Sequence, residues 1–239
     1  MKKYEYSNLC EISYLKKNEI LEKLIELGYS ENNINVFDID NHRVILVKHG
    51  IKQFIIFRGT SNANEMLTDI NCLMHKTING KIHKGFNTIA EKMVDVISTN
   101  IDFNSWIYIT GHSLGAAIAE IVANKLFEKN YLVKESVEVA KPRTGDKQYA
   151  KYSANMPFNR CRIEANMDGV CEVPLKIMGY RHHNKFYYID RKNKVWSKPS
   201  QLYIWWDKFN TAKENKDINE FVTDHAVKKY TKALKECDI

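Results

Sequence analysis

The chain has 239 residues, 44% of them hydrophobic and 27% charged, and these ordinary values exclude a disordered or fibrous protein and fit one domain with a sizeable core. Lysine and arginine (36) exceed aspartate and glutamate (29), and the formal net charge of +7 favours anionic surfaces. The basic residues are scattered rather than clustered, so we expect no nucleic-acid partner.

Apolar periodicity predicts an α/β protein in which strands and helices alternate. The predicted helices lie at about 7–28, 86–97, 115–127 and 219–235. The predicted strands are the apolar runs at 44–47, 54–57, 106–109, 137–140, 160–163, 186–189 and 195–196. The first two runs are continuous rather than alternating, which is typical of strands buried on both faces. We therefore expect a mostly parallel central sheet flanked by helices, in a single domain over 1–239 with its core over about 42–235.

The five cysteines are odd in number and irregularly spaced, which favours reduced thiols over a disulfide or zinc framework. The N-terminal segment lacks the apolar core of a secretory signal, and no apolar run approaches the roughly 20 residues that span a bilayer. The sequence thus predicts a cytoplasmic, monomeric protein that is not transmembrane. No pattern in it implies a metal or an organic cofactor.

The most informative segment is Gly111-His112-Ser113-Leu114-Gly115, which follows a β-rich run and precedes an alanine-rich helix. In a Gly-x-Ser-x-Gly turn of this kind, the glycines let a strand bend abruptly into a helix with the serine at the tip. The Ser113 hydroxyl then lies at the carboxyl edge of the sheet, beside a helix N-terminus that favours negative charge. Ser113 is the predicted nucleophile.

A nucleophilic serine needs a histidine base and an acid that orients it, and in this architecture they follow in the order Ser, Asp, His. Asp168 lies in a loop after the predicted strand at 160–163, and His225 lies where the last predicted helix begins. Asp168 and His225 are therefore the first-ranked candidates for the acid and the base. The competing histidines are His182 and His183, and the competing acids are Asp190 and Asp224.

A serine that attacks a carbonyl carbon also needs donors for the oxyanion that develops on the carbonyl oxygen. The backbone N–H of Leu114, directly after the nucleophile, is one expected donor. The second is expected after an earlier strand, and Thr60 follows the strand end Phe57-Arg58-Gly59. An ordinary β-turn is the alternative for that segment.

Together these segments resemble the class 3 lipases, the family of the filamentous-fungal triacylglycerol lipases within the α/β-hydrolase superfamily. The resemblance runs from about Val44 to Tyr230 and is carried by the segments 57–60, 83–86, 111–115, 142–145, 168–170, 179–182 and 224–230. It implies a triad of Ser113, Asp168 and His225, with Thr60 and Leu114 forming the oxyanion hole. It also implies a structural place for His182 and makes Asp190 a strand residue rather than the acid.

Family members usually cover the site with a short amphipathic lid that follows the oxyanion residue. The corresponding candidate lid here comprises Asn62, Met66, Leu67, Asp69 and Ile70, with its apolar members at helical spacing. A fixed surface helix is the alternative. The family commonly has tryptophan where Met66 stands.

Lys141 stands before Pro142, where the family usually has Phe-Gly-x. The aromatic run Leu202-Tyr203-Ile204-Trp205-Trp206 either lines an acyl pocket, inserts at a membrane interface, or packs in the core or under a loop, since most tryptophans are buried.

The hypothesis that follows is a serine carboxylester hydrolase that cleaves lipid acyl esters, triacylglycerol lipase-like or phospholipase A1-like, at a membrane or droplet surface. One alternative is a lipase-like binding or scaffold protein that no longer uses its site. Another is an acyltransferase or thioesterase with the same triad.

Overall fold

The computed structural model describes residues 1–60, 72–214 and 224–239. Its helices are α1 (Lys3–Ile12), α2 (Lys17–Glu26), α4 (Lys84–Ser98), α5 (Leu114–Glu128), α6 (Lys147–Ala154), α7 (Gln201–Glu214) and α9 (Val227–Glu236). Short 3₁₀ turns are η1 (Glu31–Asn33), η2 (Gly169–Glu172) and η3 (Lys176–Met178). None of the described helices is long and apolar enough to cross a bilayer.

The central sheet has the strand order β1-β2-β3-β6-β7-β9-β11-β12. These strands are β1 (Ile34–Ile39), β2 (His42–His49), β3 (Lys52–Phe57), β6 (Trp106–His112), β7 (Val133–Val139), β9 (Asn159–Ala165), β11 (Phe186–Ile189) and β12 (Val195–Ser197). Strands β3, β6, β7, β9 and β11 pair in parallel, while β1, β2 and β12 join antiparallel at the edges. The predicted α/β fold with a mostly parallel central sheet is confirmed.

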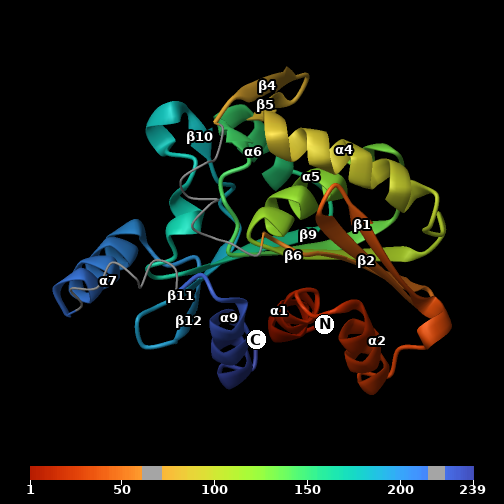
Figure 1. Ribbon diagram of the computed structural model, residues 1–239. Coiled ribbons are helices and arrows are strands. Elements are labelled where there is room, and N and C mark those ends of the chain that lie inside the picture. Colours follow the sequence, from red (N-terminus) through yellow and green to blue (C-terminus); the bar gives the residue numbers. More distant parts are fainter. Residues whose placement is uncertain (61–71, 215–223) are drawn as a thin grey trace.

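Helices cover both faces of this sheet (Figure 1). On one face α4 and α5 pack on the buried strands through a large apolar cluster that includes Phe57, Ile109 and Val122. On the other face lie α1, α2 and α9, with Tyr6 and Tyr230 completely buried among them. The two ends of the chain meet there, because the Tyr4 backbone N–H donates to the Ile239 carbonyl at 2.9 Å.

A second, smaller sheet has the order β10-β8-β5-β4. Its strands are β4 (Met74–Thr77), β5 (Gly80–His83), β8 (Gly145–Asp146) and β10 (Tyr180–Arg181). In Figure 1 it lies on the side of the molecule that carries α4 and α6. The sequence patterns did not predict this sheet, nor β1, α6 and α7.

Two expected boundaries are wrong. The N-terminal helices, α1 and α2, begin at Lys3 rather than near 7 and are separated at residues 13–16. The last helix begins at Val227 rather than near 219, since Asp224 and His225 form a turn and Ala226 has extended backbone angles. His225 therefore lies in the turn before the helix and not within it.

Candidate active site

Ser113 occupies the abrupt turn between β6 and α5. Its backbone has φ 59° and ψ −129°, a strained conformation for a residue with a side chain, and its N–H donates to the Val139 carbonyl at 3.0 Å. A Cβ on Gly111 would lie 2.2 Å from the Gly115 carbonyl oxygen, so the turn requires glycine there. This is the geometry of a nucleophile elbow.

The end of β3 lies directly against this elbow. A Cβ on Gly59 would lie 2.9 Å from the Ser113 Cβ and 2.5 Å from the His112 carbonyl oxygen, so only glycine allows the two backbones to approach this closely. Thr60 follows, and its Oγ1 is buried without a hydrogen-bond partner in the described part of the chain. The predicted oxyanion residues Thr60 and Leu114 thus flank Ser113 from two different elements.

Asp168 and His225 are in contact, as their ranking from the sequence predicts. His225 Nδ1 lies 2.9 Å from Asp168 Oδ2, and both side chains are buried. The Tyr230 hydroxyl donates to the same Oδ2 at 2.5 Å, and the Val170 backbone N–H donates to Oδ1 at 2.9 Å. Burial opposes ionisation of Asp168, but His225 and Tyr230 outweigh it and hold the pKa of Asp168 below its usual range.

His112, the residue before the nucleophile, contacts both the backbone and the ring of His225. Its Nε2 lies 2.9 Å from the His225 carbonyl oxygen, and the two rings are 4.6 Å apart between centroids. Burial, followed by the proximity of His225, lowers the pKa of His112 to about 3, so this ring is neutral. A carbonyl oxygen only accepts, so the single ring proton resides on Nε2 and the Nδ1 atom of His112 is an acceptor.

Tyr14, at the end of the α1 segment, completes this network. Its hydroxyl lies 2.7 Å from His112 Nδ1, donates its proton there, and accepts the backbone N–H of Gly59. One hydroxyl thereby links the oxyanion strand end to the elbow. Neither Tyr14 nor the contact of Tyr230 with the acid was predicted, because no local pattern connects Tyr14 to residues about a hundred positions later.

The competing candidates make other contacts. His182 Nε2 binds the Cys171 carbonyl at 2.8 Å, and Asp224 accepts the Met167 backbone N–H at 3.1 Å. Asp190 accepts from Trp196 Nε1 at 2.8 Å and from the Tyr203 hydroxyl at 2.7 Å. It follows β11 instead of lying within it, which corrects the expectation of a strand residue. The candidate lid residues, Asn62 to Ile70, lie outside the described residues.

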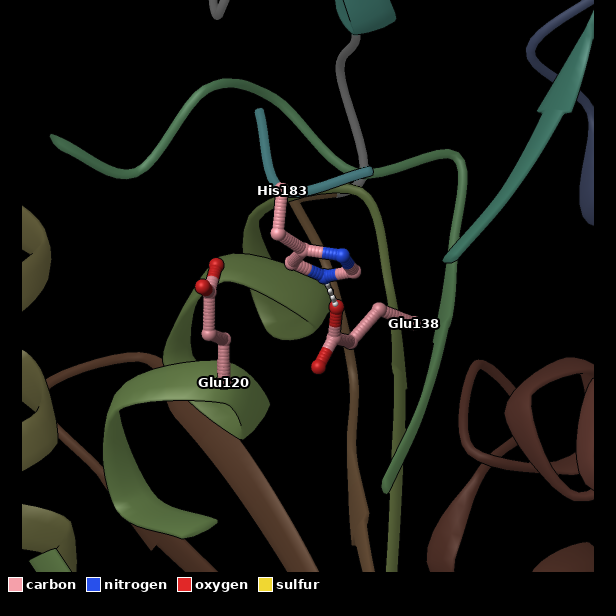
Figure 2. Close-up of side chains that lie close together, drawn as sticks. All are labelled: Glu120, Glu138 and His183. Carbon is pink, nitrogen blue, oxygen red and sulfur yellow. Dashed lines mark hydrogen bonds and ion pairs between the residues drawn. The ribbon is translucent and has the colours of Figure 1, made fainter. Parts of the chain in front are cut away.

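One group of buried side chains has the composition of a metal site. Glu120 on α5, Glu138 on β7 and His183 point toward one another, with ligand atoms within 4.8 Å, and His183 Nε2 bonds to Glu138 at 2.8 Å (Figure 2). The Lys141 ammonium, however, pairs with Glu120 and lies 3.2 Å from Glu138, and Arg160 Nε lies 3.1 Å from Glu138. Two cations therefore already balance the two carboxylates, so this arrangement does not suit a metal ion.

Replacing Lys141 with methionine is expected to cost about 3–5 kcal/mol of unfolding free energy, because two buried carboxylates would then share one fixed cation. Urea unfolding measures this loss. Lys125→Met is the matched control, since Lys125 pairs with Glu91 at 3.3 Å on the surface, and it should cost less than about 1 kcal/mol. Equal losses in the two variants would contradict the role of Lys141 as the central cation.

The buried imidazoles predict an acid-sensitive fold. Burial, with the charge of Lys141, lowers the pKa of His183 from 6.5 to about 4. The unfolded chain then binds a proton that the folded chain does not, so stability falls as pH drops through the window from about 6.5 to 4.

We expect Tm to decline between pH 7 and 4.5, with each such histidine contributing at most about 1.4 kcal/mol per pH unit. His183→Gln should reduce the slope of stability against pH, while His75→Gln, at an exposed site, should leave it unchanged. A slope that is the same in all three proteins would exclude His183 as a source.

Comparison with known proteins identifies a family for the chain. A family model described as lipase (class 3) matches residues 54–178, just over half of the chain. The lipase of Rhizomucor miehei is 28% identical over 151 residues, covering 57% of this chain and 41% of the relative. The secreted mono- and diacylglycerol lipase A of Penicillium cyclopium is 31% identical over 116 residues, covering 48% of this chain and 37% of the relative. The chain thus spans about two fifths of the length of these curated relatives.

The fold is similar over a greater length. The crystal structure of a mono- and diacylglycerol lipase from Aspergillus oryzae has a TM-score of 0.70 at 24% identity, covering 93% of this chain and 91% of that chain. The matched segment 54–178 contains the strand end at Thr60, the elbow around Ser113 and the loop of Asp168. By this match, the chain belongs to the class 3 lipase family.

Proposed function

We propose that this protein is a serine hydrolase that cleaves acyl esters of lipids, acting as a monomer on substrate at a membrane or droplet surface. The observation that carries the proposal is the buried pair of Asp168 and His225, joined at 2.9 Å, in a chain whose only glycine-flanked serine elbow holds Ser113. The names of the relatives, lipases and mono- and diacylglycerol lipases, support a glyceride-like ester as substrate.

In the proposed mechanism, His225 Nε2 accepts the proton of the Ser113 hydroxyl as Ser113 Oγ attacks the acyl carbonyl carbon. Asp168 fixes the proton of His225 on Nδ1 and stabilises the imidazolium that forms. The Leu114 N–H and Thr60 stabilise the oxyanion. His225 then donates its proton to the leaving alcohol, and water, activated by the same base, releases the fatty acid from the acyl-enzyme.

The network from Tyr14 through His112 supports this assignment. It holds the His225 carbonyl in place at 2.9 Å through a neutral ring, so the backbone of the proposed base is fixed without a second charge beside it. An imidazolium that forms on His225 would be opposed by a charged His112, and the low pKa of His112 avoids this repulsion.

Labelling with a fluorophosphonate probe, followed by peptide mapping, tests the proposal alongside hydrolysis of nitrophenyl esters of short and long chains. We expect modification at Ser113 together with turnover, and a preference for longer chains would indicate a lipase rather than an esterase. Well-folded protein that is not labelled in the presence of detergent or lipid would favour the scaffold alternative. Acyl transfer to an alcohol or thiol in preference to water would favour the acyltransferase alternative.

A further inference from the structure

Helix α7 exposes its apolar face. Leu202, Trp205, Trp206 and Phe209 recur at i, i+3, i+4 and i+7, which places them on one side of the helix. Leu202 is 74% exposed and Trp205 61%, and the rings of Trp205 and Phe209 stack with centroids 5.4 Å apart. We call these four residues the α7 apolar face. The alternative that Trp205 and Trp206 pack in the core is therefore wrong.

The inward side of the same helix combines the half-buried Tyr203 and Ile204 with two buried polar side chains. Asp207 is only 1% exposed and accepts hydrogen bonds from Asn166 Nδ2 at 2.5 Å and from the Tyr188 hydroxyl at 2.9 Å. Thr211 is also buried and accepts from Asn166 at 2.8 Å. A helix on the surface of a water-soluble protein normally directs its apolar side to the core and its polar side to solvent. On α7, in contrast, four large apolar side chains remain exposed while Asp207 and Thr211 are buried, which indicates an apolar medium outside.

These inward contacts attach α7 to the segment that carries the proposed acid. Asn166, which binds both Asp207 and Thr211, precedes Asp168 by two residues. Lys208 of α7 also pairs with Glu172, four residues after Asp168, at 2.7 Å. Figure 1 shows α7 at the periphery of the molecule, outside the helices that sandwich the sheet. The α7 apolar face is therefore outward-facing and fixed relative to the site.

Cations border the α7 apolar face. The Arg191 guanidinium lies over the Trp206 ring at 5.6 Å and pairs with the buried Asp207 at 3.7 Å. The exposed Lys213 Nζ lies over the Phe209 ring at 5.4 Å. Aromatic rings with a cationic border suit the boundary between lipid chains and anionic head groups, where tryptophan is enriched and basic side chains are attracted. A symmetric contact between two copies of this chain would instead bring these cations together.

We propose that the α7 apolar face is a docking surface for a lipid layer with anionic head groups, in which Trp205 and Phe209 insert among the acyl chains while Lys213 contacts the head groups. The proposal goes beyond the proposed function because it assigns the surface that binds the lipid layer. It rests on the proposed function only in expecting this lipid to contain the substrate. Because α7 is bound to the Asp168 segment, docking sets the position of the site relative to the lipid.

The test measures binding of the full chain, carrying Ser113→Ala to prevent hydrolysis, to sucrose-loaded vesicles of phosphatidylcholine with or without phosphatidylglycerol. We expect binding to the anionic vesicles with a blue shift of tryptophan emission, and weaker binding to the neutral ones. The double substitution Trp205→Ser with Phe209→Ser should lower the vesicle partition coefficient at least tenfold. Because both side chains are exposed, circular dichroism and Tm should report an intact fold.

Trp106→Ser is the matched control. Trp106 is also exposed and has a cation, Lys134 Nζ, 4.9 Å from its ring centre, but it lies at the start of β6, the end of the strand remote from Ser113. Vesicle binding should be unchanged by this substitution. A loss equal to that of the double variant would mean that tryptophan content alone governs binding and would overturn the proposal.

Three other results would overturn it: no binding of the parent protein to anionic vesicles, equal binding by the double variant, or a dimer in sedimentation velocity that the double variant abolishes. The last result would assign the α7 apolar face to a second copy of the chain. Since binding is measured with the Ser113→Ala protein, its outcome is independent of catalysis. If the chain with Ser113 intact fails to hydrolyse a soluble ester, the proposed function is excluded, but the vesicle-binding result still stands.

Discussion

Substitution of Ser113 by alanine is expected to reduce ester hydrolysis by roughly 10⁴- to 10⁶-fold, to the residual rate that the oxyanion donors and substrate binding alone provide. Alanine removes Oγ, the only atom that would form the acyl-enzyme, while the backbone at 113 keeps its contact with Val139. Initial rates on a soluble nitrophenyl ester at saturating substrate measure the loss as kcat.

Alanine keeps the Cβ that lies beside Gly59, so the packing of the elbow should survive. Tm and circular dichroism of the variant should match those of the parent protein, and fluorophosphonate labelling should disappear with the activity. Undiminished turnover in the alanine variant would overturn the mechanism. Persistent labelling at another serine would relocate the nucleophile.

Substitution of Asp168 by asparagine is expected to lower kcat by roughly 10³- to 10⁴-fold with little change in KM. An asparagine amide can donate to His225 Nδ1, and this stabilises the tautomer whose proton is on Nε2. That tautomer cannot accept the proton of Ser113. The Val170 N–H, 2.9 Å from Oδ1, would still donate to the amide oxygen and keep the side chain in place, while the Tyr230 hydroxyl would lose its acceptor at Oδ2.

Asp190→Asn is the control for the choice of acid. Asp190 accepts four hydrogen bonds, from Trp196, Tyr203 and the backbone of Lys192 and Lys194, and none of these groups belongs to the proposed triad. The variant should lose about 1–3 kcal/mol of stability and keep its kcat. A severe loss of kcat in Asp190→Asn with an active Asp168→Asn protein would make Asp190 the acid.

The parts of the site that the sequence predicted are those with a local pattern or a fixed chain order. Ser113 lies in a five-residue motif between a strand and a helix, and Asp168 and His225 follow it in the order that the architecture requires. Their contact at 2.9 Å agrees with that ranking. Tyr14 could not be predicted in this way, because its hydroxyl acts on His112 through tertiary packing alone.

The elements of the fold that were missed have weak or misleading patterns. β1 is an edge strand with only Ile34 fully buried, and β8 and β10 have two residues each, too few to show a period. Helix α6 has few apolar residues to mark a buried face. Helix α7 has an apolar stripe, but the stripe faces outward, whereas such a stripe normally faces the core.

The network that joins Gly59, Tyr14, His112 and His225 draws its members from both ends of the chain. During synthesis the proposed nucleophile is made well before its base: His225 follows Ser113 by on the order of ten seconds at typical translation rates of about 5–20 residues per second. Until the last helix has left the ribosome, the growing chain therefore carries a serine without its histidine. The proposed hydrolytic activity should appear only after His225 has been synthesised and the segment that carries it has packed against Asp168.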